Sequence, residues 1–141
     1  MTREARLAAI LADHAATEGA LLPILHAVQA ALGCVDAAAE AAIAQALNLS
    51  RAEVHGVVSF YHDFTATADP RPCVELCRAE ACQARGVDAL VTAAEAAAGN
   101  RVKIKTVYCL GLCSAGPAAR VGDHLHARLD EAGLVNLVKS L

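Results

Sequence analysis

The sequence has very few aromatic residues, no tryptophan and no excess of basic side chains. Aromatics make up 3% of its 141 residues and are limited to Phe60, Tyr61, Phe64 and Tyr108. Lysine and arginine number 12 against 15 aspartates and glutamates, so the formal net charge is -3. A nucleic-acid-binding protein usually carries a basic patch or a high pI. The composition therefore argues against nucleic acid as a partner.

Long apolar runs are also missing. The longest uncharged stretch, residues 19–35, contains Pro23, His26 and Gln29, and it is shorter than the roughly 20 predominantly apolar residues that span a bilayer. The first 20 residues mix charged side chains with a short apolar run, which is not a signal-peptide pattern. We therefore expect a cytoplasmic protein with no membrane contact. In that reducing compartment, six cysteines are expected to be metal ligands or redox thiols rather than disulfides.

The first part of the chain has the spacing of helices. Apolar residues recur every three or four positions in residues 2–16, 20–33 and 36–47. Ser50 and Glu53 form a capping-box pattern, which predicts the start of a fourth helix. We expect a helical bundle domain over residues 1–64. Residues 65–71 have no aliphatic side chain larger than alanine and are expected to be a linker.

The remaining residues, 72–141, alternate between strand and helix patterns. Strands are predicted at 72–77, 101–108, 117–121 and 124–129, the last two flanking a Gly122-Asp123 hairpin turn. Helices are predicted at 87–98 and from Asp130 to the end of the chain. This order fits a thioredoxin-like α/β sandwich. The whole chain is thus expected to be α+β, with the helical bundle followed by the thioredoxin-like domain.

Five of the six cysteines fall in two groups. The first group is Cys73, Cys77 and Cys82, and the second is Cys109 and Cys113, whereas Cys34 stands alone. Four thiolates complete a [2Fe–2S] or a [4Fe–4S] cluster. If residues 72–77 are extended, Cys73 and Cys77 lie about 13 Å apart at roughly 3.3 Å per residue, too far to share one small cluster.

The geometry therefore selects four ligands. Cys77 ends a predicted strand, so that Cys82 can fold back beside it, and Cys109 and Cys113 flank a turn after the next strand. We predict that Cys77, Cys82, Cys109 and Cys113 bind the cluster and that Cys73 points into the sheet packing. Gly111 and Gly116 would let the loop backbone come close to the cluster. Cys34 is expected to be a small buried hydrophobe.

Three other functions compete with this interpretation. Four thiolates at this spacing could bind a structural zinc ion in an interaction module without a redox role. A thioredoxin-like redox enzyme would require a Cys-x-x-Cys pair, which is absent. Residues 43–58 also have the pattern of a helix-turn-helix, but the segment after the turn, 51–60, carries one arginine and no lysine. Phosphate binding would then lack its usual driving force.

The cysteine spacing Cys77-x(4)-Cys82 and Cys109-x(3)-Cys113 resembles that of the thioredoxin-like [2Fe–2S] ferredoxins, and in particular the small iron–sulfur subunit beside the flavoprotein of complex I. The resemblance covers nearly the whole chain. It includes the aromatic run Val58-Ser-Phe-Tyr-His-Asp-Phe64 and the ligand loop Tyr108-Cys-Leu-Gly-Leu-Cys113. Ser50-Arg-Ala-Glu-Val-His-Gly56 and Cys77-Arg-Ala-Glu-Ala-Cys-Gln83 are most similar to the gamma subunit of soluble NAD-dependent, molybdenum-containing formate dehydrogenases.

This resemblance implies one [2Fe–2S] cluster and a non-catalytic, electron-transferring role. The partners it implies are a flavin- and NAD-binding subunit with FMN and iron–sulfur clusters, and a larger molybdopterin-containing subunit that oxidises formate. The equivalent subunit of complex I or of an NAD-linked hydrogenase is the alternative. The resemblance also implies a cis peptide bond before Pro117.

Overall fold

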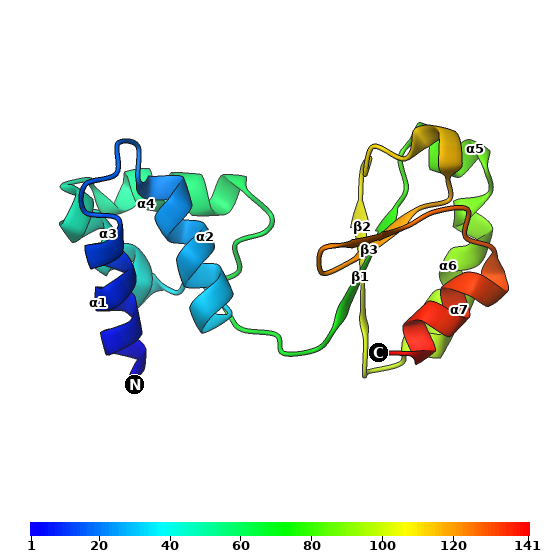
Figure 1. Ribbon diagram of the computed structural model, residues 1–141, viewed down its shortest axis with the longest axis horizontal. Helices are drawn as coiled ribbons and strands as arrows, with labels where there is room; N and C mark the ends of the chain where they lie inside the picture. The colour runs from blue at the N-terminus through cyan, green and yellow to red at the C-terminus, as the bar shows by residue number, and fades with distance from the viewer. The chain divides into compact units, whose positions relative to one another are not determined.

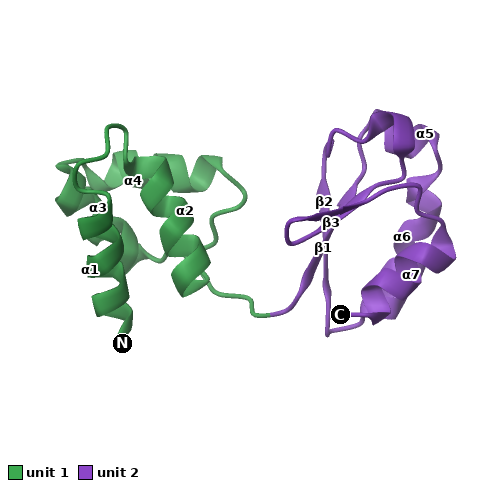
Figure 2. Ribbon diagram, viewed as in Figure 1, with its two compact units in different colours: residues 1–70 green, residues 71–141 purple.

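A computed structural model describes the whole chain, residues 1–141, as two compact units. Unit 1 comprises Met1–Pro70 and unit 2 comprises Arg71–Leu141 (Figures 1 and 2). Helices alone form unit 1, whereas unit 2 combines helices with a four-stranded sheet. The predicted α+β class is confirmed. None of the helices combines the length and apolar character that crossing a membrane requires.

Unit 1 contains four helices whose starts follow from capping side chains. Thr2, Asp36 and Ser50 each accept a hydrogen bond from a backbone N–H of the first turn, and the predicted capping box of Ser50 and Glu53 is present. Gly33 ends one helix in a left-handed conformation, with φ 77°. The helices are α1 (Arg3–Asp13), α2 (Leu21–Leu32), α3 (Ala37–Leu47) and α4 (Arg51–Phe60).

The core of unit 1 consists of aliphatic side chains from α2, α3 and α4, with Phe64 closing it after α4. The chain after Phe64 stays attached to this unit. The backbone N–H of Thr65 donates to the side-chain oxygen of Gln29 (3.0 Å), and the carbonyl of Thr65 accepts from Val35 N–H (2.8 Å). The first residue of the expected linker is therefore fixed, because its backbone hydrogen bonds are made within unit 1.

Unit 2 is a mixed sheet with strand order β2-β1-β3-β4. Strands β1 and β2 are parallel, and the other neighbours are antiparallel. Helices α6 and α7 pack together on one face of the sheet (Figure 1). Its elements are β1 (Cys73–Cys77), α5 (Glu80–Ala84), α6 (Val87–Ala98), β2 (Lys103–Val107), the 3-10 helix η1 (Cys113–Ala115), β3 (Ala119–Val121), β4 (His124–His126) and α7 (Glu131–Lys139).

Two elements of unit 2 differ from the expected secondary structure. The strand predicted at 124–129 ends at His126. Arg128 adopts a left-handed conformation, and its N–H donates a hydrogen bond to the carbonyl of Ala115 instead of to a neighbouring strand. The five-residue helix α5 was not predicted. It has no side-chain cap, and it is too short to show helical periodicity in the sequence.

Candidate functional site

The parallel pairing of β1 and β2 brings the two cysteine groups together. Cys77 is the last residue of β1 and pairs with Val107, the last residue of β2. The carboxyl ends of parallel neighbours meet at one edge of the sheet, so the loops after both strands start side by side. Cys109 lies two residues beyond Val107, and Cys82 returns to this edge within α5.

The four predicted ligands form two pairs at this edge. The Sγ atoms of Cys109 and Cys113 are 3.6 Å apart. The thiols of Cys77 and Cys82 interact, since each shifts the pKa of the other. The two pairs are also in contact, because the backbone N–H of Cys109 donates to Cys77 Sγ at 3.3 Å. The structure thus brings together all four predicted residues.

The loop after β2 adopts an uncommon backbone conformation. Cys109 has a φ of 83° and Gly111 a φ of 78°, values that are rare for a residue with a side chain. The amide of Gly111 donates to Cys109 Sγ at 3.4 Å. The loop is therefore folded so that its N–H groups point at sulfur, as a site for anionic thiolates requires.

Backbone N–H groups act against burial at Cys77. Burial alone would raise the pKa of its thiol, but the N–H groups of Ala79, Cys109 and Leu110 and the thiol of Cys82 hold the pKa below its usual value. At Cys82, burial and the hydrogen bond that its thiol donates to Cys77 raise the pKa. The pKa of Cys113 is raised, chiefly by its hydrogen bond with Cys109. In each pair, therefore, one cysteine opposes the ionisation of the other. A bound cation would favour the thiolate form of both.

Gly116 is the second glycine that the sequence singled out, and it lies against Cys82. A Cβ atom at position 116 would be 2.9 Å from Cys82 Sγ, so only glycine fits without moving this sulfur. The peptide bond between Gly116 and Pro117 is cis, as the resemblance implied. The backbone donors Ala79 and Ala118 were not predicted, because any residue can supply an N–H group and the sequence carries no signal for it.

The other two cysteines lie apart from this edge. Cys34 is buried in unit 1, as predicted, with the guanidinium of Arg3 3.6 Å from its sulfur. Cys73 begins β1 and is only partly buried. It alternates with Val74, which is in the core under α6 and α7, and so lies on the opposite face of the sheet. Cys73 was predicted to point into the sheet packing, and it lies instead on the face of the sheet opposite the helices.

The distance between the sulfurs of Cys109 and Cys113 fits two thiolates bound to the same metal ion. A tetrahedral metal about 2.3 Å from two thiolates separates their sulfurs by about 3.8 Å, close to the 3.6 Å between Cys109 and Cys113. The structure brings the sulfurs together as two pairs and not as one group of three or more ligands. The donor set and its division into pairs fit a two-iron cluster, in which each iron takes two thiolates.

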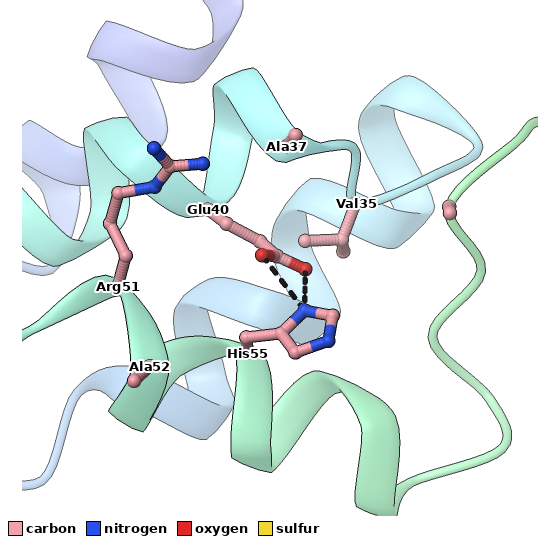
Figure 3. Close-up of a pocket in the computed structure, with 7 residues that line it drawn as sticks. Val35, Ala37, Glu40, Arg51, Ala52 and His55 are labelled. Carbon is pink, nitrogen blue, oxygen red and sulfur yellow. Dashed lines mark hydrogen bonds and ion pairs between the residues drawn. The ribbon is translucent and has the colours of Figure 1, made fainter.

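Unit 1 contains a separate cavity of about 510 Å³ between α3 and α4 (Figure 3). Glu40, the one buried charged residue, accepts a hydrogen bond from His55 Nδ1 at 3.1 Å there. No cysteine lines this cavity. The helix-turn-helix alternative gains nothing from the charge of unit 1, which has three arginines and no lysine against eight acidic residues.

Comparison with known proteins connects this site to one family. The family model for thioredoxin-like [2Fe–2S] ferredoxins matches residues 7–141. One of the subunits of the NADH-quinone oxidoreductase of Rhizobium meliloti (strain 1021) is 30% identical over 149 residues, covering 99% of this chain and 89% of that protein. The NADP-reducing hydrogenase subunit HndA of Solidesulfovibrio fructosivorans is 28% identical over 121 residues, covering 79% of this chain and 71% of that protein.

Solved structures agree with this relationship. The crystal structure of NAD+-reducing [NiFe]-hydrogenase in the H2-reduced state matches with a TM-score of 0.72 and 28% identity over 86% of this chain. The match spans only 22% of the hydrogenase chain. The family model covers nearly the full length of the chain, and the fold and the two cysteine pairs agree with it. This chain belongs to the thioredoxin-like [2Fe–2S] ferredoxins, whose cofactor is one [2Fe–2S] cluster.

Proposed function

We propose that this chain is the electron-transfer subunit of an NAD-dependent formate dehydrogenase and holds its cluster near the FMN of a partner flavoprotein. Cys77, Cys82, Cys109 and Cys113 are the proposed ligands. The single observation that carries the proposal is the meeting of two cysteine pairs at the carboxyl edge of β1 and β2. When bound, the cluster supplies one-electron transfer.

The residues around the ligands have defined tasks in this proposal. Cys77 and Cys82 would hold one iron, and Cys109 and Cys113 the other. The N–H groups that point at Cys77 and Cys109 stabilise negative charge on sulfur and so tune the reduction potential. Gly116 leaves room for Cys82 to keep its position. The chain itself contributes binding, positioning and tuning, and no bond-breaking chemistry.

The choice of partner complex depends on resemblance. The runs 50–56 and 77–83 support the formate dehydrogenase, with its flavoprotein and molybdopterin subunits as partners in the cytoplasm. The names of the curated relatives favour a second candidate, the equivalent subunit of NADH-quinone oxidoreductase or of an NAD-linked hydrogenase. Since the chain matches about a fifth of a longer hydrogenase chain, we propose that it works beside the other redox modules of such a complex.

Cluster chemistry is tested first on the purified full chain. Anaerobic purification should give a coloured protein with two irons and two acid-labile sulfides per chain. Reduction with dithionite should produce an EPR signal from one unpaired electron. A colourless protein with about one zinc and no iron would instead support the zinc-stabilised interaction module.

The partner complex requires a second experiment. The tagged chain is isolated from its native host with the subunits that remain bound to it, and the complex is assayed for NAD reduction with formate or with hydrogen and for quinone reduction with NADH. Activity with formate supports the first candidate. Activity only with hydrogen or only with quinone assigns the chain to the second.

A further inference from the structure

The two cysteine pairs differ sharply in exposure. Cys77 and Cys82 are each 2% exposed and belong to the core of unit 2. Cys109 and Cys113 are both exposed. A redox partner can therefore approach the site from the side of the loop 109–113 and not from the side of Cys77 and Cys82.

The loop is held in one conformation before any partner arrives. Leu110 and Leu112 pack against the core of unit 2, while the residues between and beside them face solvent. The left-handed Cys109 and Gly111, together with the N–H to sulfur bonds, fix the turn. A preformed surface loses little conformational entropy on association.

Tyr108 lies next to the exposed ligand Cys109 and is the only aromatic residue of unit 2. It is 76% exposed. Its ring stacks on no other ring and its hydroxyl has no hydrogen-bond partner in the chain. Tyrosine and arginine are enriched among the residues that contribute most to the affinity of protein interfaces.

Two arginines without ion-pair partners lie near η1, which follows the loop 109–113. The stem of Arg85 lies near Gly116, since its Cδ would be 3.3 Å from a Cβ there. Arg128 has a φ of 52°, and its N–H donates to Ala115 O in η1 at 2.7 Å. Both are exposed, and neither forms a salt bridge, in contrast to Arg78, which pairs with Asp88.

Figure 1 shows that α5 and the segment leading through η1 lie at one end of unit 2. We propose that this end, formed by Tyr108, the loop 109–113, Arg85 and Arg128, is the docking surface for an acidic patch of the flavin-carrying partner. This inference rests on the proposed function, because it names where the electron partner binds. Tyr108 anchors the contact, and the two arginines steer an acidic surface toward the exposed cysteine pair.

The test uses the full, cluster-loaded chain and the NADH-reducible flavoprotein that co-purifies with the tagged wild-type chain. We compare Tyr108→Ala and the double variant Arg85→Ala/Arg128→Ala with two controls. Leu125→Ala removes another exposed apolar side chain, and Arg101→Ala removes an exposed arginine before β2, at the opposite end of that strand. The readouts are the Kd, the association rate at several salt concentrations, and the rate of cluster reduction by NADH through the flavoprotein.

We expect Tyr108→Ala to raise the Kd about tenfold or more and to slow NADH-dependent reduction. The double arginine variant should associate more slowly and with a weaker dependence on salt. Both variants should keep the wild-type iron content, EPR spectrum and reduction by dithionite, because none of the three side chains is a cluster ligand. The control variants should stay within about twofold of wild type, the range expected for surface changes of roughly 0.5 kcal/mol or less.

Each contrary outcome has a separate meaning. If Tyr108→Ala and the arginine variant bind the flavoprotein like wild type, the docking surface is wrong while the proposed function stands. If the arginine variant shifts only the midpoint potential, the arginines serve the cluster and the acidic-partner inference is overturned. If the wild-type chain holds the cluster but no flavoprotein associates with it, the proposed function itself fails.

Discussion

The backbone N–H of Cys109 donates a hydrogen bond to the sulfur of Cys77, 32 residues earlier in the chain, at 3.3 Å. This contact exists because β1 and β2 are parallel neighbours that end in the same register. It also requires the left-handed φ of Cys109. One interaction thus connects the sheet topology, the loop conformation and the placement of the two cysteine pairs.

Serine substitutions test the ligand assignment. Serine at Cys77, Cys82, Cys109 or Cys113 should abolish or distort the EPR signal of the reduced cluster, because an alkoxide is a poor substitute for a thiolate ligand. The measurement is EPR after dithionite, with an iron count on the same sample. Each variant should also show a lower iron content.

Cys73→Ser and Cys34→Ser are the matched controls. Cys73 begins β1, and Cys34 lies in unit 1, so both should leave the signal intact. Loss of the signal in Cys73→Ser together with a normal signal in Cys77→Ser would show that the ligand register is shifted by one strand length.

Gly116→Ala should disturb the site although it replaces none of the proposed ligands. The added methyl group would lie 2.9 Å from Cys82 Sγ and 3.6 Å from Cys82 Cα, so the α5 side of the site must move. We expect reduced cluster retention and a loss of about 1–3 kcal/mol in stability, as for other overpacked positions. Visible absorption during anaerobic urea unfolding measures both.

Gly56→Ala is the control for this glycine. Gly56 is in the interior of α4, and a Cβ there meets no atom within 4 Å. Alanine should therefore be neutral or should stabilise α4 by roughly 0.5–1 kcal/mol. A Gly116→Ala protein with wild-type absorption and the same urea midpoint would contradict the close approach of Cys82.

The sequence predicted those features that depend on local pattern. The capping box of Ser50 and Glu53 is present, and so is the Gly122-Asp123 hairpin. The convergence of the cysteines was predictable because strand ends and turns follow from the positions of β-pattern and glycine. Other features depend on tertiary contacts that no local pattern records: the side of β1 that faces the helices, the contact between Gly116 and Cys82, and the exposure of Tyr108.

The ion cluster on the open face of the sheet is such a tertiary feature. Glu75 on β1 binds Lys105 on β2 (3.2 Å) and Arg120 on β3, its direct neighbours in both ladders. Its side chain is only 13% exposed. The carboxylate thus links three strands.

Glu75→Gln should destabilise unit 2 by about 1–3 kcal/mol, because two cations would remain around an uncharged amide in a partly buried place. Urea unfolding of the cluster-loaded chain, followed by visible absorption, measures the change. Glu95→Gln is the control, since Glu95 is an exposed residue of α6, and it should change stability by less than about 0.5 kcal/mol. Equal midpoints for both variants would show that the ion cluster contributes nothing.

The capping box of α4 should make the stability of this helix depend on pH. The backbone N–H and then the hydroxyl of Ser50 donate to Glu53 and lower the pKa of its carboxyl in the folded state. A lowered folded-state pKa contributes stability above the ordinary pKa of glutamate, and this contribution is lost as the pH falls through the folded-state value. Amide hydrogen exchange of α4 should therefore be slower in wild type than in Glu53→Gln at neutral pH, and the difference should vanish in acid.

Glu18→Gln, which changes an exposed carboxylate outside the helices, should follow wild type at every pH. Ser50→Ala should weaken the helix by about 1 kcal/mol, and wild-type protection in that variant would mean that the capping box does not hold the start of α4.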